Sequence, residues 1–304
     1  MSLKGKKGVD ISSSNGSVDM VKIKNAGYDF VMIRCGFGDD IKSQDDSQFE
    51  ANVRKAEKAK LPWGVYIYSY ALNKTEARSE VEHVKRLLKN KKPTLPVAFD
   101  MEDADGYKSR HGAMKKSVIT DICKTFLSGI KKAGYYPMLY TSLSWIGSYI
   151  GTDVTDNYDL WVAQWNKTCD YKGDNLGMWQ YGGEVNYLES NSISGVGKID
   201  KDKCFKNYPT IIKNGGYNNW KKPAAKTLDK AGFKKGDSGS GVLALKQLLI
   251  LLKNKGEITA TMKNDGIFGG GTEKAVNQVL KKLGYKQNGI AGEKFIKKLG
   301  KLLN

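Results

Sequence analysis

Two acidic side chains at the end of an apolar segment are the residues of this sequence best suited to chemistry. The segment 95–99 (LPVAF) reads as a buried strand and is followed at once by Asp100, Glu102 and Asp103. Because side chains alternate along a strand, Asp100 and Glu102 point to the same face, with their Cα atoms about 6.6 Å apart. Like charges at this spacing raise the pKa of one carboxyl group and leave the other ionised. The pair can supply a proton donor and a charged partner, whereas Asp103 faces the other way and is expected to be structural.

The elements that must position these acids alternate regularly along the chain. Hydrophobic runs predict eight strands, at residues 7–11, 30–35, 63–69, 96–101, 136–141, 160–164, 177–181 and 196–199. Helix-like segments lie at residues 18–25, 44–60, 74–90, 115–132 and 143–150. Alternating strands and helices indicate parallel βαβ units, and the lack of a glycine-rich phosphate fingerprint favours a closed barrel. The predicted fold class is α/β, an irregular TIM-like barrel of eight strands and about five helices.

In such barrels the chemistry sits at the carboxyl ends of the strands, and this rule selects four acids. Asp10 ends the first strand, Asp100 and Glu102 end the fourth, and Asp200 ends the eighth. Any one of them could instead cap a helix, Asp10 above all, because a run rich in serine follows it. Strands one and eight are neighbours in a closed barrel, so the four carboxylates are expected to meet on one rim.

Aromatic and amide side chains gather at the same strand ends and favour a sugar ligand. Flat rings with a polar tip match the alternating apolar and hydroxylated faces of a pyranose. Taken singly, each such residue would more often belong to the core, since half of the side chains of a strand face inward. Their collection at one end favours a groove. The candidate substrate-binding residues are Tyr66, Tyr68, Tyr70, Tyr140, Trp165 and Gln180.

Charge and composition divide the chain into two parts. The 304 residues carry a net charge of +18, and residues 224–304 hold sixteen lysines against six acidic residues. Helical patterns at 242–252, 272–283 and 293–303 predict a small three-helix domain over 231–304, behind a first domain over 1–210 and a linker over 211–230. A basic surface attracts polyanions such as nucleic acid, anionic lipid or anionic wall polymers. Nucleic acid is disfavoured, because the aromatic rim is acidic and the excess positive charge lies in the tail.

The sequence offers little for metal, cofactor or membrane chemistry. Four scattered cysteines and two histidines show no zinc-ligand spacing, so neither a metal nor a cofactor is expected. The most apolar stretch, 242–252, is too short to span a membrane, and the first residues show no secretory signal. A protein with these features that acts outside the cell needs another route of release.

Seven segments, in order, resemble family 25 of the glycoside hydrolases, the Chalaropsis-type lysozymes of bacteria and phage endolysins. They are GVDIS at 8–12, FVMIR at 30–34, GVY at 64–66, PVAFDME at 96–102, LWVAQW at 160–165, WQY at 179–181 and ID at 199–200. The resemblance implies an eight-stranded barrel with five helices. It also implies muramidase activity, the hydrolysis of the β-1,4 bond between N-acetylmuramic acid and N-acetylglucosamine.

The resemblance assigns roles to the four acids. Glu102 would be the general acid, Asp100 would orient or polarise the acetamido group of the substrate, and Asp10 and Asp200 would complete the acidic pocket. The family usually has asparagine two residues after the last acid, where this chain has Asp202. The tail resembles a three-helix peptidoglycan-binding domain, through residues 236–239 and 265–269 with Thr272, Ala275 and Val276.

The implied partners are bacterial peptidoglycan and anionic wall polymers. With no signal peptide visible, the protein is expected to be made in a host cytoplasm and to act outside it, on the cell wall. Assistance by the acetamido oxygen of the substrate is favoured over a protein nucleophile, because two acids on one strand are poorly placed to flank a bond from opposite faces.

Two alternative functions fit parts of the pattern. Another wall or chitin N-acetylhexosaminidase would use similar acids, although Leu95 and Ala98 stand where the D-x-x-D-x-D-x-E pattern of chitinases has its first two acids. A non-catalytic basic protein that binds walls or polyanions would need only the charge of the tail.

Overall fold

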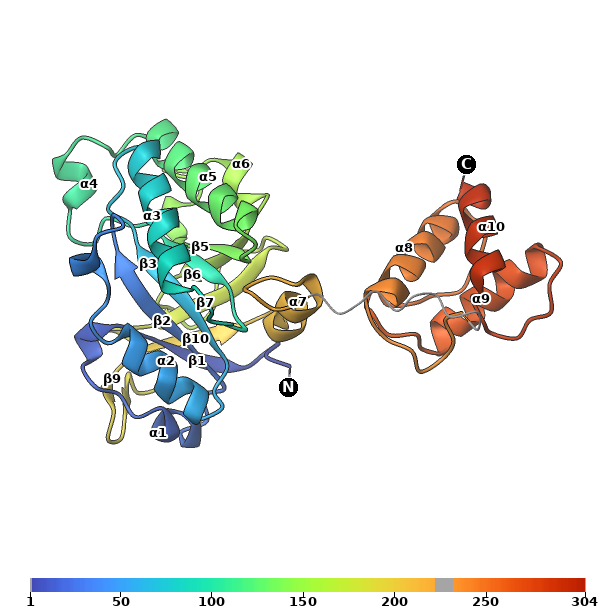
Figure 1. The fold of residues 1–304 in the computed structure, drawn as a ribbon, viewed down its shortest axis with the longest axis horizontal. Helices are drawn as coiled ribbons and strands as arrows, with labels where there is room; N and C mark the ends of the chain where they lie inside the picture. The colour runs from blue at the N-terminus through green and yellow to red at the C-terminus, as the bar shows by residue number, and fades with distance from the viewer. Residues whose placement is uncertain (1, 222–231, 304) are drawn as a thin grey trace. The chain divides into compact units, whose positions relative to one another are not determined.

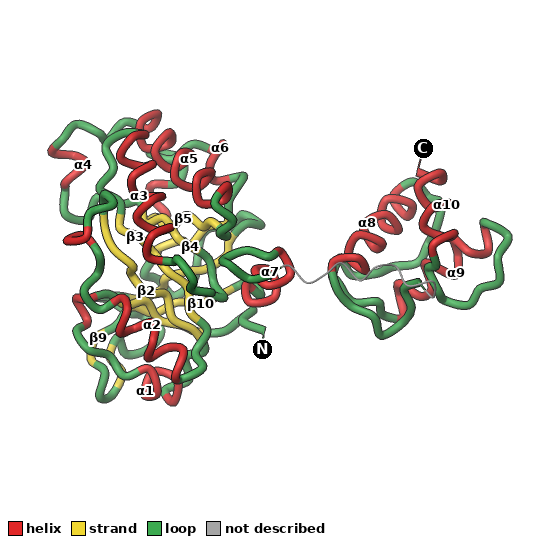
Figure 2. The backbone as a smooth tube through the Cα atoms, viewed as in Figure 1, coloured by secondary structure: helices red, strands yellow, loops and turns green. Residues whose placement is uncertain are grey.

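The computed structural model describes residues 2–221 and 232–303, which form two compact units divided between residues 221 and 222. In the first unit eight strands close into a barrel, visible in Figure 1 and Figure 2. They are β1 (Lys7–Ile11), β2 (Phe30–Phe37), β3 (Trp63–Tyr68), β4 (Val97–Asp100), β5 (Pro137–Ser142), β6 (Asp159–Ala163), β7 (Leu176–Gly182) and β10 (Asp200–Cys204). Strands β1 to β7 run parallel to one another, and β10 closes the barrel antiparallel to both β1 and β7. The predicted α/β barrel of eight strands is confirmed.

The eighth strand is not the one predicted. The prediction of a barrel strand over 196–199 is wrong, because Gly197–Lys198 is β9 and pairs only with β8 (Ser192–Ile193) in a separate small sheet. The barrel strand is β10, with the sequence DKDKC, in which Lys201 and Asp202 are fully buried. Such a polar strand carries no hydrophobic periodicity, so a search for apolar runs passes over it.

Helices cover the outside of the barrel (Figure 1). They are α1 (Met20–Asn25), α2 (Phe49–Lys58), α3 (Lys74–Leu87) and α5 (Lys116–Lys132), with the short α4 (Tyr107–Arg110) and α6 (Thr152–Thr155) and the last helix α7 (Tyr208–Gly215). Side chains of Asp19 and Asn73 cap α1 and α3 by accepting bonds from backbone N–H groups. The helix predicted over 143–150 is wrong. A 3₁₀ turn forms at Leu143–Trp145, and Gly147 takes a left-handed φ of 84° that ends any helical path.

Alternation along the strands separates an outer from an inner core. Phe99 points outward, and its ring stacks on Phe126 of α5 with 3.9 Å between centroids. Ala98 points inward, into the barrel interior that it shares with Met32, Met138, Tyr140, Trp161 and Met178. Asp100 follows Ala98 by two positions and therefore also faces inward, at the end of β4. The strand pattern thus carries this carboxyl group to the mouth of the barrel.

The segment after α7 is folded onto the barrel, which corrects the predicted linker over 211–230. Asn218 is fully buried. Its Nδ2 donates to the carbonyl oxygens of Pro93 at 3.2 Å and Leu95 at 2.8 Å, and its Oδ1 accepts from the backbone N–H of Tyr136 at 2.9 Å. The polar side chains after α7, which led to the linker prediction, instead form hydrogen bonds with backbone groups of the barrel. The first unit therefore extends to residue 221, and residues 222–230 of the predicted linker lie outside the described residues.

Asn218→Ala should lower the free energy of unfolding of the first unit by about 3 to 4 kcal/mol. The variant loses three buried hydrogen bonds of about 1 kcal/mol each, and its backbone φ of 54° costs alanine roughly 1 kcal/mol more. Urea unfolding followed by tryptophan fluorescence measures the change in this unit, because all six tryptophans of the chain lie between residues 63 and 220.

Asn90→Ala is the matched control for that measurement. Asn90 has a similar φ of 65° but is exposed. We expect a loss of about 1 kcal/mol from the backbone conformation alone. Equal losses in the two variants would show that the buried bonds of Asn218 contribute nothing.

The second unit contains three helices close to their predicted positions. They are α8 (Ser240–Asn254), α9 (Gly270–Lys282) and α10 (Glu293–Leu303), which share an apolar core. Lys246 of α8 is buried, and its Nζ donates to Oδ1 of Asp265 at 2.6 Å and to the carbonyl oxygen of Ile267 at 2.8 Å. In residues 2–221 and 232–303, no helix is long and apolar enough to cross a membrane.

Candidate active site

Four carboxylates meet at the rim of the barrel. Asp10 lies near the end of β1, Asp100 ends β4, and Glu102 follows β4 by two residues. Asp200 begins β10 and is the register partner of Asp10. Burial and the charge of Glu102 raise the pKa of Asp200 to about 6, and the charges of Asp202 and Asp200 add to burial in raising the pKa of Asp10. These mutual influences place the four predicted acids in one electrostatic group.

Asp200 reaches this rim from an unexpected direction. It lies at the amino end of an antiparallel strand and not, as predicted, at the carboxyl end of a parallel one. The amino end of an antiparallel strand adjoins the carboxyl end of its neighbour, which here is the end of β1 that carries Asp10. The antiparallel closure of the barrel is therefore what sets Asp200 beside Asp10.

Asp100 and Glu102 form the centre of the group. Asp100 is only 4% exposed, and burial together with the charge of Glu102 raises its pKa well above the ordinary range. Burial also raises the pKa of Glu102, against the opposing influence of Asp100 and of the Lys108 ammonium. Two neighbouring buried carboxyl groups do not both ionise readily, so the pair titrates as a unit and retains a proton to higher pH than an isolated carboxyl group does. The pair can thus serve as a proton donor.

The sequence of the first unit matches a family model over strands β1 to β7 of the barrel, and β10 with Asp200 lies beyond the match. The model of glycosyl hydrolases family 25 matches residues 9–189, which include Asp10, Asp100 and Glu102. The chain belongs to this family. This family 25 protein is therefore a glycoside hydrolase, and its acid pair lies within the matched residues.

This family 25 hydrolase is similar in sequence to two curated relatives and in fold to one solved structure. Lysozyme M1 of Streptomyces globisporus is 24% identical over 66% of this chain and 67% of its own length. The N,O-diacetylmuramidase of Arthroderma benhamiae is 30% identical over 57% of this chain and 73% of its own length. The modular autolysin LytC of Streptococcus pneumoniae, solved with a synthetic peptidoglycan ligand, has a TM-score of 0.56 at 23% identity over 65% of this chain. The alignment covers 46% of LytC, less than half of that protein.

In this family 25 hydrolase a chain of hydrogen bonds through Gln180 holds Asp10. Nε2 of Gln180 donates to Oδ2 of Asp10 at 2.9 Å, and its Oε1 accepts from the hydroxyl of Tyr140 at 3.0 Å and from Nε1 of Trp165 at 3.2 Å. Gln180 and Tyr140 are buried, so among the predicted substrate-binding residues these two serve to position Asp10. Trp165 is 39% exposed and offers its ring to a ligand.

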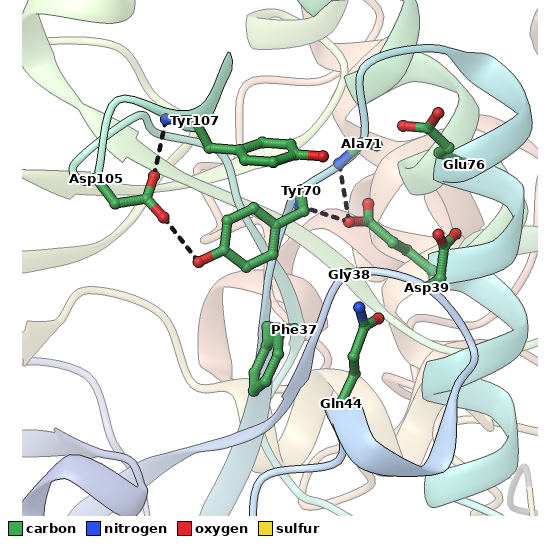
Figure 3. A pocket seen from close by; sticks show the side chains of 10 residues that line it. Phe37, Gly38, Asp39, Gln44, Tyr70, Ala71, Glu76, Asp105 and Tyr107 are labelled. Atoms are coloured by element: carbon green, nitrogen blue, oxygen red, sulfur yellow. Dashed lines mark hydrogen bonds between the residues drawn. The ribbon is translucent and has the colours of Figure 1, made fainter. Parts of the chain in front are cut away.

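Tyr70, which follows β3, and Tyr107 of α4 line a pocket, shown in Figure 3. The hydroxyl of Tyr70 donates to Oδ2 of Asp105 at 2.7 Å, and the ring of Tyr70 lies 5.1 Å from that of Tyr68 and 4.9 Å from that of Tyr107. The cavity of about 450 Å³ is lined by Phe37, Gly38, Asp39, Gln44, Tyr70, Ala71, Glu76, Glu80, Asp105 and Tyr107. Sequence reasoning missed Asp105 and Tyr107, although the polar segment directly after the acid pair was a signal for them.

Asp202 is a further buried acid in contact with this group. Nε1 of Trp161 donates to Oδ1 of Asp202 at 2.8 Å, and Tyr66 packs edge-on against the same indole at 5.9 Å. Burial raises the pKa of Asp202 well above the ordinary range. A carboxylic acid that keeps its proton has one acceptor oxygen and one donor hydroxyl, the same pair of functions as an amide. A protonated Asp202 therefore offers the same hydrogen-bonding functions as the asparagine expected at this position from the resemblance.

Asp202→Asn should keep the rate of hydrolysis near neutral pH within a few fold of wild type. Asparagine carries no charge, and neither does the protonated Asp202 that it replaces, so the electrostatic surroundings of Asp10 stay the same near neutral pH. The acid limb of the pH–rate profile should therefore stay in place. Rates measured across the acidic and neutral range check this expectation.

Asp202→Ala is the matched comparison. It leaves Nε1 of Trp161 without its partner and should cost about 1 to 3 kcal/mol of stability. If the asparagine variant were as inactive as the alanine variant, a carboxyl group at this position would be required and the amide-like role would be refuted.

Proposed function

We propose that this family 25 hydrolase cleaves the β-1,4 bond between N-acetylmuramic acid and N-acetylglucosamine in bacterial peptidoglycan. The observation that carries the proposal is the buried pair of Asp100 and Glu102, which retains a proton at an aromatic-lined barrel rim. Such a pair can protonate a glycosidic oxygen. Support comes from relatives named lysozyme and N,O-diacetylmuramidase, and from the fold likeness to an autolysin solved with a peptidoglycan ligand.

Glu102 is the proton donor in this mechanism. It is less buried than Asp100, which lies behind it at the end of β4, so Glu102 is the group that meets the glycosidic oxygen. As the bond from the anomeric carbon to the leaving oxygen breaks, the proton of Glu102 passes to that oxygen and positive charge develops on the sugar ring. Asp200, with a pKa of about 6, is ionised near neutral pH and stabilises that charge, and its register partner Asp10 completes the acidic pocket.

The acetamido oxygen of the substrate is the nucleophile in this mechanism. Asp100 and Glu102 leave the same strand end two residues apart and cannot flank the bond from opposite faces. The acetamido oxygen therefore bonds to the anomeric carbon as the leaving group departs, and Asp100 orients and polarises the acetamido group. Water, deprotonated by Glu102, then opens the cyclic intermediate and restores the proton to Glu102. Trp165, Tyr68 and Tyr70 offer exposed ring surface to the neighbouring sugars.

Product analysis tests the proposed bond specificity. Purified peptidoglycan is digested with the full chain, the new reducing ends are reduced with borohydride, and the amino sugars are identified after acid hydrolysis. Cleavage after N-acetylmuramic acid yields muramitol. Glucosaminitol instead of muramitol would overturn the proposal and favour a wall N-acetylglucosaminidase, and cleavage of chitin at an equal rate would favour a general N-acetylhexosaminidase.

The second unit is the proposed wall-binding part of the protein, with peptidoglycan and anionic wall polymers as its ligands. Residues 224–304 carry sixteen lysines against six acidic residues, more than half of the net charge of the chain. A basic module attached to a hydrolase raises the local concentration of the enzyme on a polyanionic wall. The proposed site of action is accordingly the cell wall, outside the cytoplasm.

A chain ending at residue 221 tests this role without cutting into the barrel, whose last contacts are made by Asn218 and Trp220. Pull-down of the full and shortened chains is compared on walls with and without teichoic acid. We expect the shortened chain to bind both walls more weakly. Equal binding by both chains would remove the targeting role, and a difference confined to teichoic acid would identify the anionic polymer as the ligand.

A further inference from the structure

Lys108 is a fully buried cation that the mechanism above does not use. It lies in the short helix α4 and is 1% exposed. Its Nζ donates to the carbonyl oxygen of Ser69 and lies 5.8 Å from the centre of the Tyr68 ring. Burying an ammonium group costs on the order of several kcal/mol in lost hydration. Negative charge close to the ammonium offsets this cost. The surroundings of Lys108 must therefore supply that charge.

Ser69, which accepts from Lys108, is bonded both to a buried acid and to the backbone at the end of β4. Glu80 of α3 is fully buried and accepts bonds from Oγ of Ser69 at 3.0 Å and from the backbone N–H groups of Tyr70 at 2.8 Å and Ala71 at 3.2 Å. The backbone N–H of Ser69 donates to the carbonyl oxygen of Asp100 at 3.0 Å. Ser69 thus links the lysine to the strand end that bears the catalytic pair.

We propose that Lys108 is a positioning residue for Asp100 and Glu102, whose buried ammonium keeps one of the two carboxyl groups ionised while the other holds the proton. The inference rests on the proposed function of the pair. Without a cation, burial and mutual repulsion both favour the neutral form of each acid, and the pair would hold two protons near neutral pH. Lys108 opposes this by lowering the pKa of Asp100 and of Glu102.

Other charged groups also surround the pair and the lysine. Arg34 of β2 acts on Asp100 in the same direction as Lys108, and Asp105 acts on Glu102 in the opposite direction. Lys108 itself is faced by Glu80 of α3, by Asp100 and Asp103 at the end of β4, and by the thiol of Cys123 on α5, which burial keeps protonated. Asp200 and the hydroxyls of Tyr68 and Tyr140 face Glu102 from β10, β3 and β5. Among these, Lys108 is the cation that acts on both members of the pair.

Loss of the Lys108 charge should move the pH–rate profile in one defined direction. Removing the ammonium raises the pKa of both carboxyl groups, because their anions lose a favourable neighbour. The first ionisation of the pair sets the acid limb of the pH–rate profile and the second sets the alkaline limb. Both limbs should therefore move to higher pH in Lys108→Met. Lys108→Arg keeps the charge and should leave both limbs in place.

The experiment measures pH–rate profiles of the full chain on peptidoglycan stripped of teichoic acid, so that the substrate contributes few titrating phosphates. We expect Lys108→Met to shift both limbs upward by about one pH unit, within the range known for a neighbouring charge. A loss of rate at every pH with unmoved limbs would show that Lys108 is only a packing residue. If the wild-type enzyme did not cleave this peptidoglycan, that result would refute the proposed function. It would not refute the inferred effect of Lys108 on the acid pair.

Glu80→Gln keeps the test decisive if Lys108→Met does not fold. Glutamine can accept the two backbone bonds through its oxygen and donate to Oγ of Ser69, so the local structure is retained. Burial raises the pKa of Glu80 to about 7, so its negative charge compensates the ammonium mainly above neutral pH. Removing that charge leaves the ammonium less compensated there, and the alkaline limb should move to lower pH. An alkaline limb unmoved in Glu80→Gln, with Tm near wild type, would overturn the inference.

Discussion

Glu102→Gln should reduce the rate of peptidoglycan hydrolysis by about 10³-fold or more, within the range that general acids contribute. Glutamine has nearly the same shape as glutamic acid but no proton to give to the leaving oxygen. Glu102 is partly exposed at the rim, and its side chain bonds to Asp100, which an amide at position 102 can also do. The Tm of the variant should therefore stay close to that of wild type, which separates lost chemistry from lost structure.

Release of reducing ends from purified peptidoglycan is the measurement for this variant, because turbidity alone responds to binding as well as to cleavage. Glu184→Gln is the matched control: it makes the same chemical change at an exposed acid that acts electrostatically on Asp200. We expect the control to stay within a few fold of wild type. A Glu102→Gln enzyme with at least a tenth of the wild-type rate would sink the assignment of the acid.

Asp100→Asn should cost about 10²-fold or more in rate and should also move the alkaline limb of the pH–rate profile to lower pH. In wild type, deprotonating the pair completely places two negative charges side by side, which raises the second pKa. With asparagine at position 100, Glu102 ionises without a charged neighbour and with an amide that can donate to it. Glu102 then loses its proton at a lower pH.

Asp103→Asn is the control on the same stretch of chain. Asp103 accepts bonds from the backbone N–H groups of Lys108 at 2.6 Å and Ser109 at 3.1 Å, so it caps the turn of α4 and has the structural role predicted for it. Asp103 acts electrostatically on Lys108 and is not a member of the pair, so its asparagine variant should move the alkaline limb less than Asp100→Asn does. If Asp100→Asn lost rate without any movement of that limb, the two carboxyl groups would not be a coupled pair.

Much of the barrel could be predicted because its strands carry long apolar runs. The runs around Val31, Val65 and Val97 are buried on both faces, which is what a parallel sheet under helices requires. Strand β10 escaped prediction because Lys201 and Asp202 are buried by the closing of the barrel, a long-range event without a local pattern. The folded segment after α7 escaped for a related reason, since Asn218 bonds to backbone groups more than 80 residues away in sequence.

The acids of the site could be predicted from the sequence, but the residues that bond to them or act on their charge could not. Asp10, Asp100 and Glu102 end or follow strands, so the barrel rule alone carries them to one rim. The partners that adjust these acids come from elements with no such rule. Lys108 sits in a helix of four residues, and Gln180 reads as one more residue of an aromatic strand end. Their roles depend on distances across the barrel that no local pattern encodes.

The antiparallel strand β10 also determines when, during synthesis and folding, the four acids of the proposed site come together. Asp10 and Asp200 are register partners separated by about 190 residues of chain, so their pairing belongs to the contacts that form late and at a high cost in loop-closure entropy. A nascent chain that has not yet reached β10 has its early strands but lacks one of its four acids, and the edges of β1 and β7 stay unpaired. The proposed catalytic rim is therefore completed by the same event that closes the barrel, and an unfinished chain both lacks that rim and is prone to associate through its open edges.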